Sequence, residues 1–106
     1  LDLKAAVEKS DFIYTDTWVD MEFFLDQKFE AEKQRRVEVF APYQINMDLL
    51  SMTDALVMHC LPAHKGYEVT AEVMSSPRCI ALNQAENRLH LQKAVLIRML
   101  GGLNRE

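Results

Sequence analysis

Three short apolar segments, separated by segments of helix-forming residues, constrain the fold of this chain more than any other feature. They span residues 11–16, 54–60 and 78–83. The middle segment is almost continuously apolar, which is typical of a parallel strand covered on both faces. Strands that alternate with helices indicate βαβ units. The chain is therefore predicted to have an α/β fold, with a parallel sheet, flanking helices and a partial Rossmann-like (doubly wound) topology.

The segments between the predicted strands carry helix signals. Residues 29–40 are dense in Glu, Lys, Arg and Ala, which favour helix, and Pro42 ends that helix. Asn46 is a typical N-cap for a helix over residues 47–52. The other helices are predicted before residue 11, from Thr70 onward, and over residues 85–100, the last closed by Gly101 and Gly102.

Composition excludes several classes of protein. The 106 residues carry 12 basic and 16 acidic side chains, a net charge of −4, which argues against nucleic-acid binding. No apolar run approaches the roughly 20 residues of a membrane span. Cys60 and Cys79 are too few and too far apart for a disulfide scaffold or a CxxC metal site. Two free cysteines and the absence of a signal-peptide pattern favour a cytoplasmic location, and no linker divides residues 1–106.

Polar clusters follow each predicted strand, at residues 16–18, 59–62 and 84–88. Ligands of open parallel sheets bind beyond the carboxyl ends of the strands, at one edge of the sheet. We therefore expect the three clusters to converge on one rim, and we take them as candidate site residues.

The second cluster, His-Cys-Leu-Pro, is the most informative. Adjacent strand residues point to opposite faces, so His59 and Cys60 are poorly placed to share a metal or to form a nucleophile pair. If the chain turns at Pro62, the backbone carbonyls of Cys60 and Leu61 leave the ladder and can accept hydrogen bonds from a small NH-rich ligand. A buried strand end with a satisfied histidine and an inert cysteine explains the same residues equally well.

The other two clusters also have two interpretations each. Arg88, next to Glu86 and Asn87 at a helix start, could bind an anion, or it could belong to a solvated first turn. Asp16, at a strand end, could pair with the ammonium group of a substrate, or it could cap a turn.

Three blocks of sequence, taken together, are similar to the carboxyl-terminal part of the ornithine carbamoyltransferase family. They are Tyr-Thr-Asp-Thr-Trp-Val-Asp-Met at 14–21, Met-His-Cys-Leu-Pro-Ala-His at 58–64 and Gln-Ala-Glu-Asn-Arg-Leu-His at 84–90. The resemblance covers nearly the whole chain. It implies that residues 1–106 form the C-terminal portion of the ornithine-binding domain. The N-terminal carbamoyl phosphate domain, with its Ser-Thr-Arg-Thr-Arg loop, is then expected to be absent from this sequence.

The resemblance implies carbamoyl transfer from carbamoyl phosphate to the side-chain amine of ornithine, giving citrulline and phosphate, with no metal and no cofactor. His59 and Arg88 resemble the groups that hold the carbamoyl oxygen and stabilise the charge developing on it. The backbone carbonyls of Cys60 and Leu61 resemble the acceptors of the carbamoyl NH₂ group.

At the amine end, Asp16 and the Cys60 side chain resemble the pair that orients the attacking amine. Met21 resembles the residue whose backbone helps to hold the α-amino and carboxylate groups. The family usually reads Ser-Met-Gly where this chain has Asp20, Met21 and Glu22. An Asp at that position would repel an α-carboxylate or attract an ammonium, so Asp20 is a candidate determinant of substrate identity.

Several alternatives stay open. The amine could be another one, such as putrescine, or the chain could be a non-catalytic ligand-binding module on the same fold. The second alternative is motivated by Asp20 and by Asn83, which stands where the family often has Asp. Aspartate carbamoyl transfer is less favoured, because His-Cys-Leu-Pro is typical of the ornithine branch. The family resemblance also implies a homotrimeric parent enzyme and an inactive chain when these 106 residues are isolated.

Overall fold

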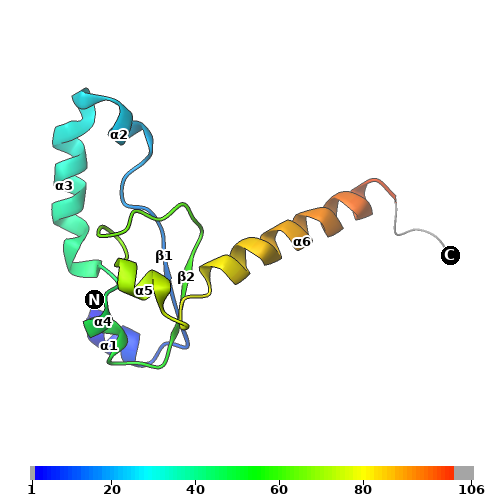
Figure 1. The fold of residues 1–106 in the computed structure, drawn as a ribbon, viewed down its shortest axis with the longest axis horizontal. Coiled ribbons are helices and arrows are strands. Elements are labelled where there is room, and N and C mark those ends of the chain that lie inside the picture. Colours follow the sequence, from blue (N-terminus) through cyan, green and yellow to red (C-terminus); the bar gives the residue numbers. More distant parts are fainter. Residues whose placement is uncertain (1, 102–106) are drawn as a thin grey trace.

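A two-stranded parallel sheet with flanking helices forms the centre of the computed structural model, which describes residues 2–101 (Figure 1). This confirms the predicted α/β fold class. The elements in chain order are α1 (Leu3–Glu8), β1 (Phe12–Thr15), α2 (Glu22–Leu25), the 3-10 helix η1 (Gln27–Phe29), α3 (Glu30–Phe40), the 3-10 helix η2 (Ala41–Tyr43), α4 (Met47–Leu50), β2 (Leu56–His59), α5 (Ala71–Ser75) and α6 (Ala81–Met99).

The parallel pairing of β1 and β2 positions the candidate site. Phe12 pairs with Leu56 at one end, and Thr15 pairs with His59 at the other. Both strands therefore end at the same edge of the sheet, and the next residues, Asp16 and Cys60, lie side by side there. The strands predicted over 11–16 and 54–60 are confirmed, each slightly shorter than expected.

The prediction of a third strand over residues 78–83 is wrong, because this segment contains only an isolated bridge followed by a helix. Cys79 forms a single parallel bridge with Val57, made by hydrogen bonds from Val57 N to Arg78 O and from Ile80 N to Val57 O, both 2.8 Å. Helix α6 then begins at Ala81, earlier than the predicted start at residue 85. The segment from 81 to 86 is rich in Ala, Leu, Gln and Glu, which favour helix. An apolar run this short does not distinguish a strand from a helix by its pattern.

Three of the predicted helix boundaries are confirmed by capping features. The Asn46 side chain accepts a hydrogen bond from Leu49 N at 2.9 Å and starts α4, which ends at Leu50, before the predicted residue 52. The Thr70 hydroxyl caps α5 in the same way. Gly101, with φ of +77°, follows α6 as predicted. Gly102 lies outside the described residues.

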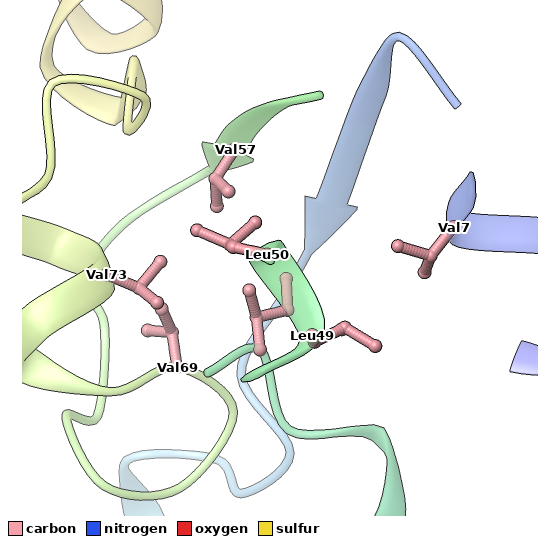
Figure 2. Close-up of a cluster of buried hydrophobic side chains, with 7 residues drawn as sticks. Val7, Leu49, Leu50, Val57, Val69 and Val73 are labelled. Atoms are coloured by element: carbon pink, nitrogen blue, oxygen red, sulfur yellow. The ribbon is translucent and has the colours of Figure 1, made fainter. Parts of the chain in front are cut away.

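A small aliphatic core lies between β2, α4 and α5 (Figure 2). Its buried members are Val7, Ile45, Leu49, Leu50, Val57, Val69 and Val73. Each such side chain contributes about 1.5–3 kcal/mol through burial. Helix α6 projects away from this core (Figure 1), and many of its apolar side chains, Leu89 and Leu96 among them, are exposed. No helix within residues 2–101 is long and apolar enough to cross a membrane.

Arg78 ties the core segments together, and its loss is expected to lower the stability of the fold. Its guanidinium donates hydrogen bonds to the carbonyls of Leu50 (2.9 Å), Thr53 (2.7 Å) and Ala55 (2.7 and 3.0 Å). Because a hydrogen bond from a charged donor contributes about 1.5–3 kcal/mol, Arg78→Met should lower the free energy of unfolding by about 2–4 kcal/mol. Urea titration measures the change. Arg98→Met, on exposed α6, is the control, and equal effects of the two substitutions would contradict the expectation.

Candidate functional site

The residues that follow β1 and β2 meet directly at the carboxyl edge of the sheet. The Cys60 thiol donates a hydrogen bond to Asp16 Oδ1 at 2.9 Å, and Thr17 N donates to the same oxygen at 2.7 Å. The first two predicted clusters therefore converge as expected, and the contact joins side chains that are far apart in the sequence. Asp16 is exposed and Cys60 is half-buried, so a ligand can approach the pair.

The Asp16–Cys60 contact shifts the pKa values of both groups in opposite directions. The hydrogen bond from the thiol, supported by the Thr17 N–H, lowers the pKa of Asp16. The same hydrogen bond to a carboxylate, with partial burial, raises the pKa of Cys60. At neutral pH the pair is thus an ionised carboxylate beside a protonated thiol. This arrangement can accept hydrogen bonds from an amine, and it makes Cys60 a poor nucleophile.

Removing the Asp16 carboxylate is expected to make Cys60 more reactive. In a Cys79→Ser background, where Cys60 is the remaining cysteine, Asp16→Ala should move the pH midpoint of iodoacetamide alkylation to lower pH. The reason is that thiolate is the reacting form, and neither the hydrogen bond nor the negative charge then opposes its formation. Asp20→Ala is the control, since Asp20 bonds Arg36 and not Cys60. A midpoint that stays in place or moves upward would contradict the assignment.

The chain turns sharply after β2, at Leu61 and Pro62. Leu61 has a φ of +57°, in the left-handed region, and its N–H donates to His59 Nδ1 at 2.8 Å. The Leu61–Pro62 peptide bond is cis. Because β2 ends at His59, the backbone of Cys60 and Leu61 lies beyond the ladder, as the sequence predicted for this turn.

The His59 side chain is fully buried and both of its ring nitrogens are engaged within the chain. Nδ1 accepts from Leu61 N, and Nε2 lies 3.1 Å from Glu68 Oε1, where the Glu68 side chain is also 0% exposed. Of the two interpretations that the sequence allowed, this geometry fits the buried histidine whose ring nitrogens are both hydrogen-bonded within the chain. Sequence reasoning assigned no role to Glu68, and the signal available was that the segment Glu-Val-Thr at residues 68–70 also fits the family resemblance.

The third cluster reaches the rim through Gln84. Its Oε1 atom accepts a hydrogen bond from His59 N at 3.1 Å and ties the first turn of α6 to the end of β2. Arg88 lies one turn further along α6, on the same helix face as Gln84, and is exposed. Within residues 2–101 no hydrogen bond joins Arg88 to Asp16, His59 or Cys60, so the structure brings Arg88 near the rim without placing it in that cluster.

Asp20 lies beyond the rim, in an ion pair with α3. Its Oδ2 atom is 3.2 Å from Arg36 Nη1, while Arg36 Nε is 3.1 Å from Glu32 Oε1. The Arg36 guanidinium also lies over the Phe23 ring, 4.6 Å from its centre. Met21 is 56% exposed, at the start of α2. Arg36 therefore partly neutralises the charge that Asp20 introduces.

A surface pocket of about 570 Å³ extends from Asp16 to α3. Its charged lining residues are Asp16, Glu32, Arg35 and Arg36. Hydrogen bonds from Arg35 and Arg36 lower the pKa of Glu32 to about 2. The pocket thus has an acidic end at the rim and guanidinium groups opposite. No cluster of three or more His, Cys, Asp or Glu side chains in the described part of the chain has the arrangement of a metal site.

Comparisons with known proteins give one consistent result. The family model for the Asp/Orn-binding domain of aspartate/ornithine carbamoyltransferases matches residues 1–99. The ornithine carbamoyltransferase of Archaeoglobus fulgidus is 51% identical over 102 residues, which cover 94% of this chain and 31% of that protein.

Solved structures agree with this match. The ornithine carbamoyltransferase of Pyrococcus furiosus is 48% identical, with a TM-score of 0.76 over 91% of this chain and 29% of that one. A mutant N-acetyl-L-ornithine transcarbamylase, complexed with carbamyl phosphate and N-succinyl-L-norvaline, is 34% identical, with a TM-score of 0.70 over 90% of this chain and 28% of that one. The chain spans less than a third of the length of these relatives.

Proposed function

Because the chain belongs to the aspartate/ornithine carbamoyltransferase family, we propose that it supplies the amine-binding part of a carbamoyl-transfer site. The reaction is transfer of the carbamoyl group from carbamoyl phosphate to the side-chain amine of ornithine, giving citrulline and phosphate. The observation that carries this proposal is the contact between Asp16 and Cys60 at the carboxyl edge of the sheet. The names of the relatives, ornithine carbamoyltransferases of Archaeoglobus and Pyrococcus, support it.

The chemistry of the Asp16–Cys60 pair fits attack by an uncharged amine. The amine nitrogen forms a bond to the carbonyl carbon, the bond from that carbon to the phosphate oxygen breaks, and phosphate leaves with the electron pair. The proton that the amine nitrogen loses as the ureido group forms is taken up by the leaving phosphate. The lowered pKa of Asp16 makes it a weak base, so its role is to accept an N–H hydrogen bond and aim the nitrogen lone pair. The Cys60 thiol stays protonated and does not compete for the carbonyl carbon.

The carbamoyl group is proposed to bind beside the turn that follows β2. The backbone carbonyls of Cys60 and Leu61 accept hydrogen bonds from its NH₂ group, and the Arg88 guanidinium binds its oxygen, where negative charge develops. The bond between Gln84 and His59 N, which fixes the first turn of α6 at the rim, supports this role for Arg88. Since both ring nitrogens of His59 are used within the chain, His59 contributes by holding the turn.

The remainder of the site is proposed to come from outside these residues. Residues 1–106 correspond to the C-terminal portion of an ornithine-binding domain, and an N-terminal domain binds the phosphate of carbamoyl phosphate. The sequence contains no Ser-Thr-Arg-Thr-Arg loop. The working enzyme is proposed to be a homotrimer that needs no cofactor, as the family resemblance implies, and to be cytoplasmic, as its two free cysteines favour.

A chimeric enzyme tests the proposal. Residues 1–99 replace the matching segment of the Archaeoglobus fulgidus enzyme, and citrulline formation from carbamoyl phosphate and ornithine is measured. The chimera is expected to form citrulline, and the 106-residue chain alone is expected to form none. A folded chimera that binds carbamoyl phosphate but carbamoylates neither ornithine nor another amine would favour the non-catalytic module.

The identity of the amine is the part of this proposal that Asp20 affects most. Asp20 stands where the resemblance predicts Ser, and a relative that shares the fold is named for N-acetyl-L-ornithine. The second candidate function is therefore carbamoyl transfer to a different amine, such as putrescine, which has no α-carboxylate for Asp20 to repel. The ion pair between Asp20 and Arg36 reduces this repulsion, and for this reason ornithine is the substrate we favour.

Asp20→Ser is expected to lower the KM of the chimera for ornithine. Two exposed unit charges about 4 Å apart interact by about 1 kcal/mol in water, so the change should be up to about fivefold. Arg36→Ala removes the neutralising partner and should raise the same KM. Asp48→Ser, an exposed position on α4, is the control. An enzyme that uses putrescine well and ornithine poorly, with Asp20→Ser reversing the preference, would establish the second candidate.

A further inference from the structure

We propose that Glu68 is a positioning residue for the carbamoyl end of this site. By accepting a hydrogen bond from His59 Nε2, it fixes the tautomer of His59, and the other ring nitrogen then holds the turn at Leu61. The inference rests on the proposed function, because that turn carries the carbonyls proposed to bind the carbamoyl NH₂ group. Nothing in the motif His-Cys-Leu-Pro itself points to Glu68.

The backbone around Glu68 is held in place from both sides. Ile45 N donates to Glu68 O at 2.9 Å, and Thr70 N donates to Ile45 O at 3.0 Å, which forms a parallel bridge. The Gln44 side-chain amide donates to the carbonyls of Gly66 (2.9 Å) and Tyr67 (2.8 Å). These hydrogen bonds fix the backbone on both sides of Glu68, and they therefore hold its buried carboxylate in position.

The Glu68 Oε1 atom has two donors. His64 N donates to it at 2.6 Å, and His59 Nε2 lies 3.1 Å from it. A charged or polar side chain with no exposed surface is costly unless it is hydrogen-bonded, so these contacts explain how Glu68 is tolerated there. In the described residues the second oxygen, Oε2, has no hydrogen-bond partner, which leaves Oε1 as the atom that does the binding.

The hydrogen bond at the other ring nitrogen shows which tautomer of His59 is present. His59 Nδ1 accepts from Leu61 N at 2.8 Å, and an imidazole nitrogen accepts only when it carries no proton. The ring proton is then on Nε2, from which it is donated to Glu68. A ring with its proton on Nδ1 would place two donors face to face at Leu61. Glu68 thus selects the tautomer that the turn requires.

The turn needs such an anchor because of its backbone conformation. Leu61 has a φ of +57°, and a left-handed conformation is costly for a residue other than glycine. The hydrogen bond from Leu61 N to His59 offsets part of this cost. When the anchor is lost, Leu61 is free to return to an ordinary conformation, and the carbonyls of Cys60 and Leu61 change direction.

Nuclear magnetic resonance of the 106-residue chain tests the anchor without any substrate. We expect the ¹⁵N spectrum to show His59 as a single tautomer, protonated on Nε2, and we expect the Leu61 amide to be protected from exchange. Glu68→Leu should give a tautomer mixture and fast exchange at Leu61, while Glu68→Gln, which keeps an acceptor oxygen, should preserve both signatures. Glu72→Leu and Glu72→Gln, at an exposed position of α5, are matched controls.

Either of two outcomes would overturn the anchor: a wild-type His59 with its proton on Nδ1, or a Leu61 amide that exchanges as fast as those of exposed loops. Both are read on the wild-type chain, so they decide the matter even where Glu68→Leu does not fold.

The consequence for binding is measured in the chimera. Glu68→Leu should raise the KM for carbamoyl phosphate at least tenfold, and Glu68→Gln should restore most of the loss. An unchanged KM in a folded Glu68→Leu chimera would overturn the positioning role. If the chimera with Glu68 unchanged has no activity, the proposed function is refuted. The tautomer of His59 in the 106-residue chain would still decide whether Glu68 holds the turn.

Discussion

Replacing Arg88 with alanine is expected to lower the kcat of the chimera by about 100- to 1000-fold, the loss typical of removing one donor from an oxyanion site. Negative charge develops on the carbamoyl oxygen as the amine attacks, and the guanidinium is the group of this chain proposed to meet it. Arg88 is exposed on α6, one turn beyond the Gln84 contact that fixes the helix at the rim. Its removal should therefore leave the fold intact.

The Arg88 prediction separates a contact made in the transition state from general electrostatic attraction. Arg98→Ala removes the same charge from the far end of α6 and should leave kcat unchanged. Arg88→Lys keeps the charge but lacks the planar fork of donors, so we expect only partial recovery. Steady-state kinetics with both substrates varied give the answer. Equal rates for the Arg88→Ala and Arg98→Ala enzymes would remove Arg88 from the site.

Replacing Asp16 with alanine is expected to lower kcat/KM for ornithine by about 100-fold or more. Correct orientation of a reacting group contributes at this level. Asp16→Asn keeps the shape and one acceptor oxygen but loses the charge, so its loss should be smaller. Asp48→Ala, an exposed position on α4, is the control.

The pH dependence gives the Asp16 prediction a second readout. The pKa of Asp16 is lowered by the Cys60 thiol and the Thr17 N–H, so Asp16 stays ionised throughout the neutral range. It loses its charge only as the pH falls through that lowered value. Activity lost between pH 8 and pH 6 is therefore expected to come from a group other than Asp16, such as the amine substrate, and Asp16→Asn should leave the position of that limb unchanged. A limb that moves with the Asp16 substitution would contradict the role of Asp16 as an orienting acceptor.

The meeting of Asp16 and Cys60 could be predicted from the sequence because it depends on a general property of parallel sheets. Two parallel strands end at the same edge, so the residues that follow them are neighbours, however far apart they lie in the chain. The capping roles of Asn46 and Thr70 were predictable for a similar reason, since a helix N-terminus leaves unpaired N–H groups that these side chains satisfy.

Other features depend on contacts that no local pattern encodes. The segment after Cys79 has apolar residues suited to a strand and residues suited to a helix, and here the helix prevails from Ala81 onward. The pairing of His59 with Glu68 needs a loop that folds back against Ile45, and Arg78 finds its carbonyl partners on a separate segment. Such contacts follow from tertiary packing, which spacing along the sequence does not reveal.

The central claim is that the carboxyl edge of this sheet binds the attacking amine at Asp16 and the carbamoyl group at the turn after β2. A crystal structure of the chimera with a bisubstrate analogue, in which a carbamoyl phosphate mimic is joined to ornithine, tests it most directly. The linking nitrogen is predicted to lie within hydrogen-bond distance of the Asp16 carboxylate, roughly 2.7–3.2 Å, with the carbonyl oxygen toward Arg88. An analogue bound with its linking nitrogen away from both Asp16 and Cys60 would contradict the claim.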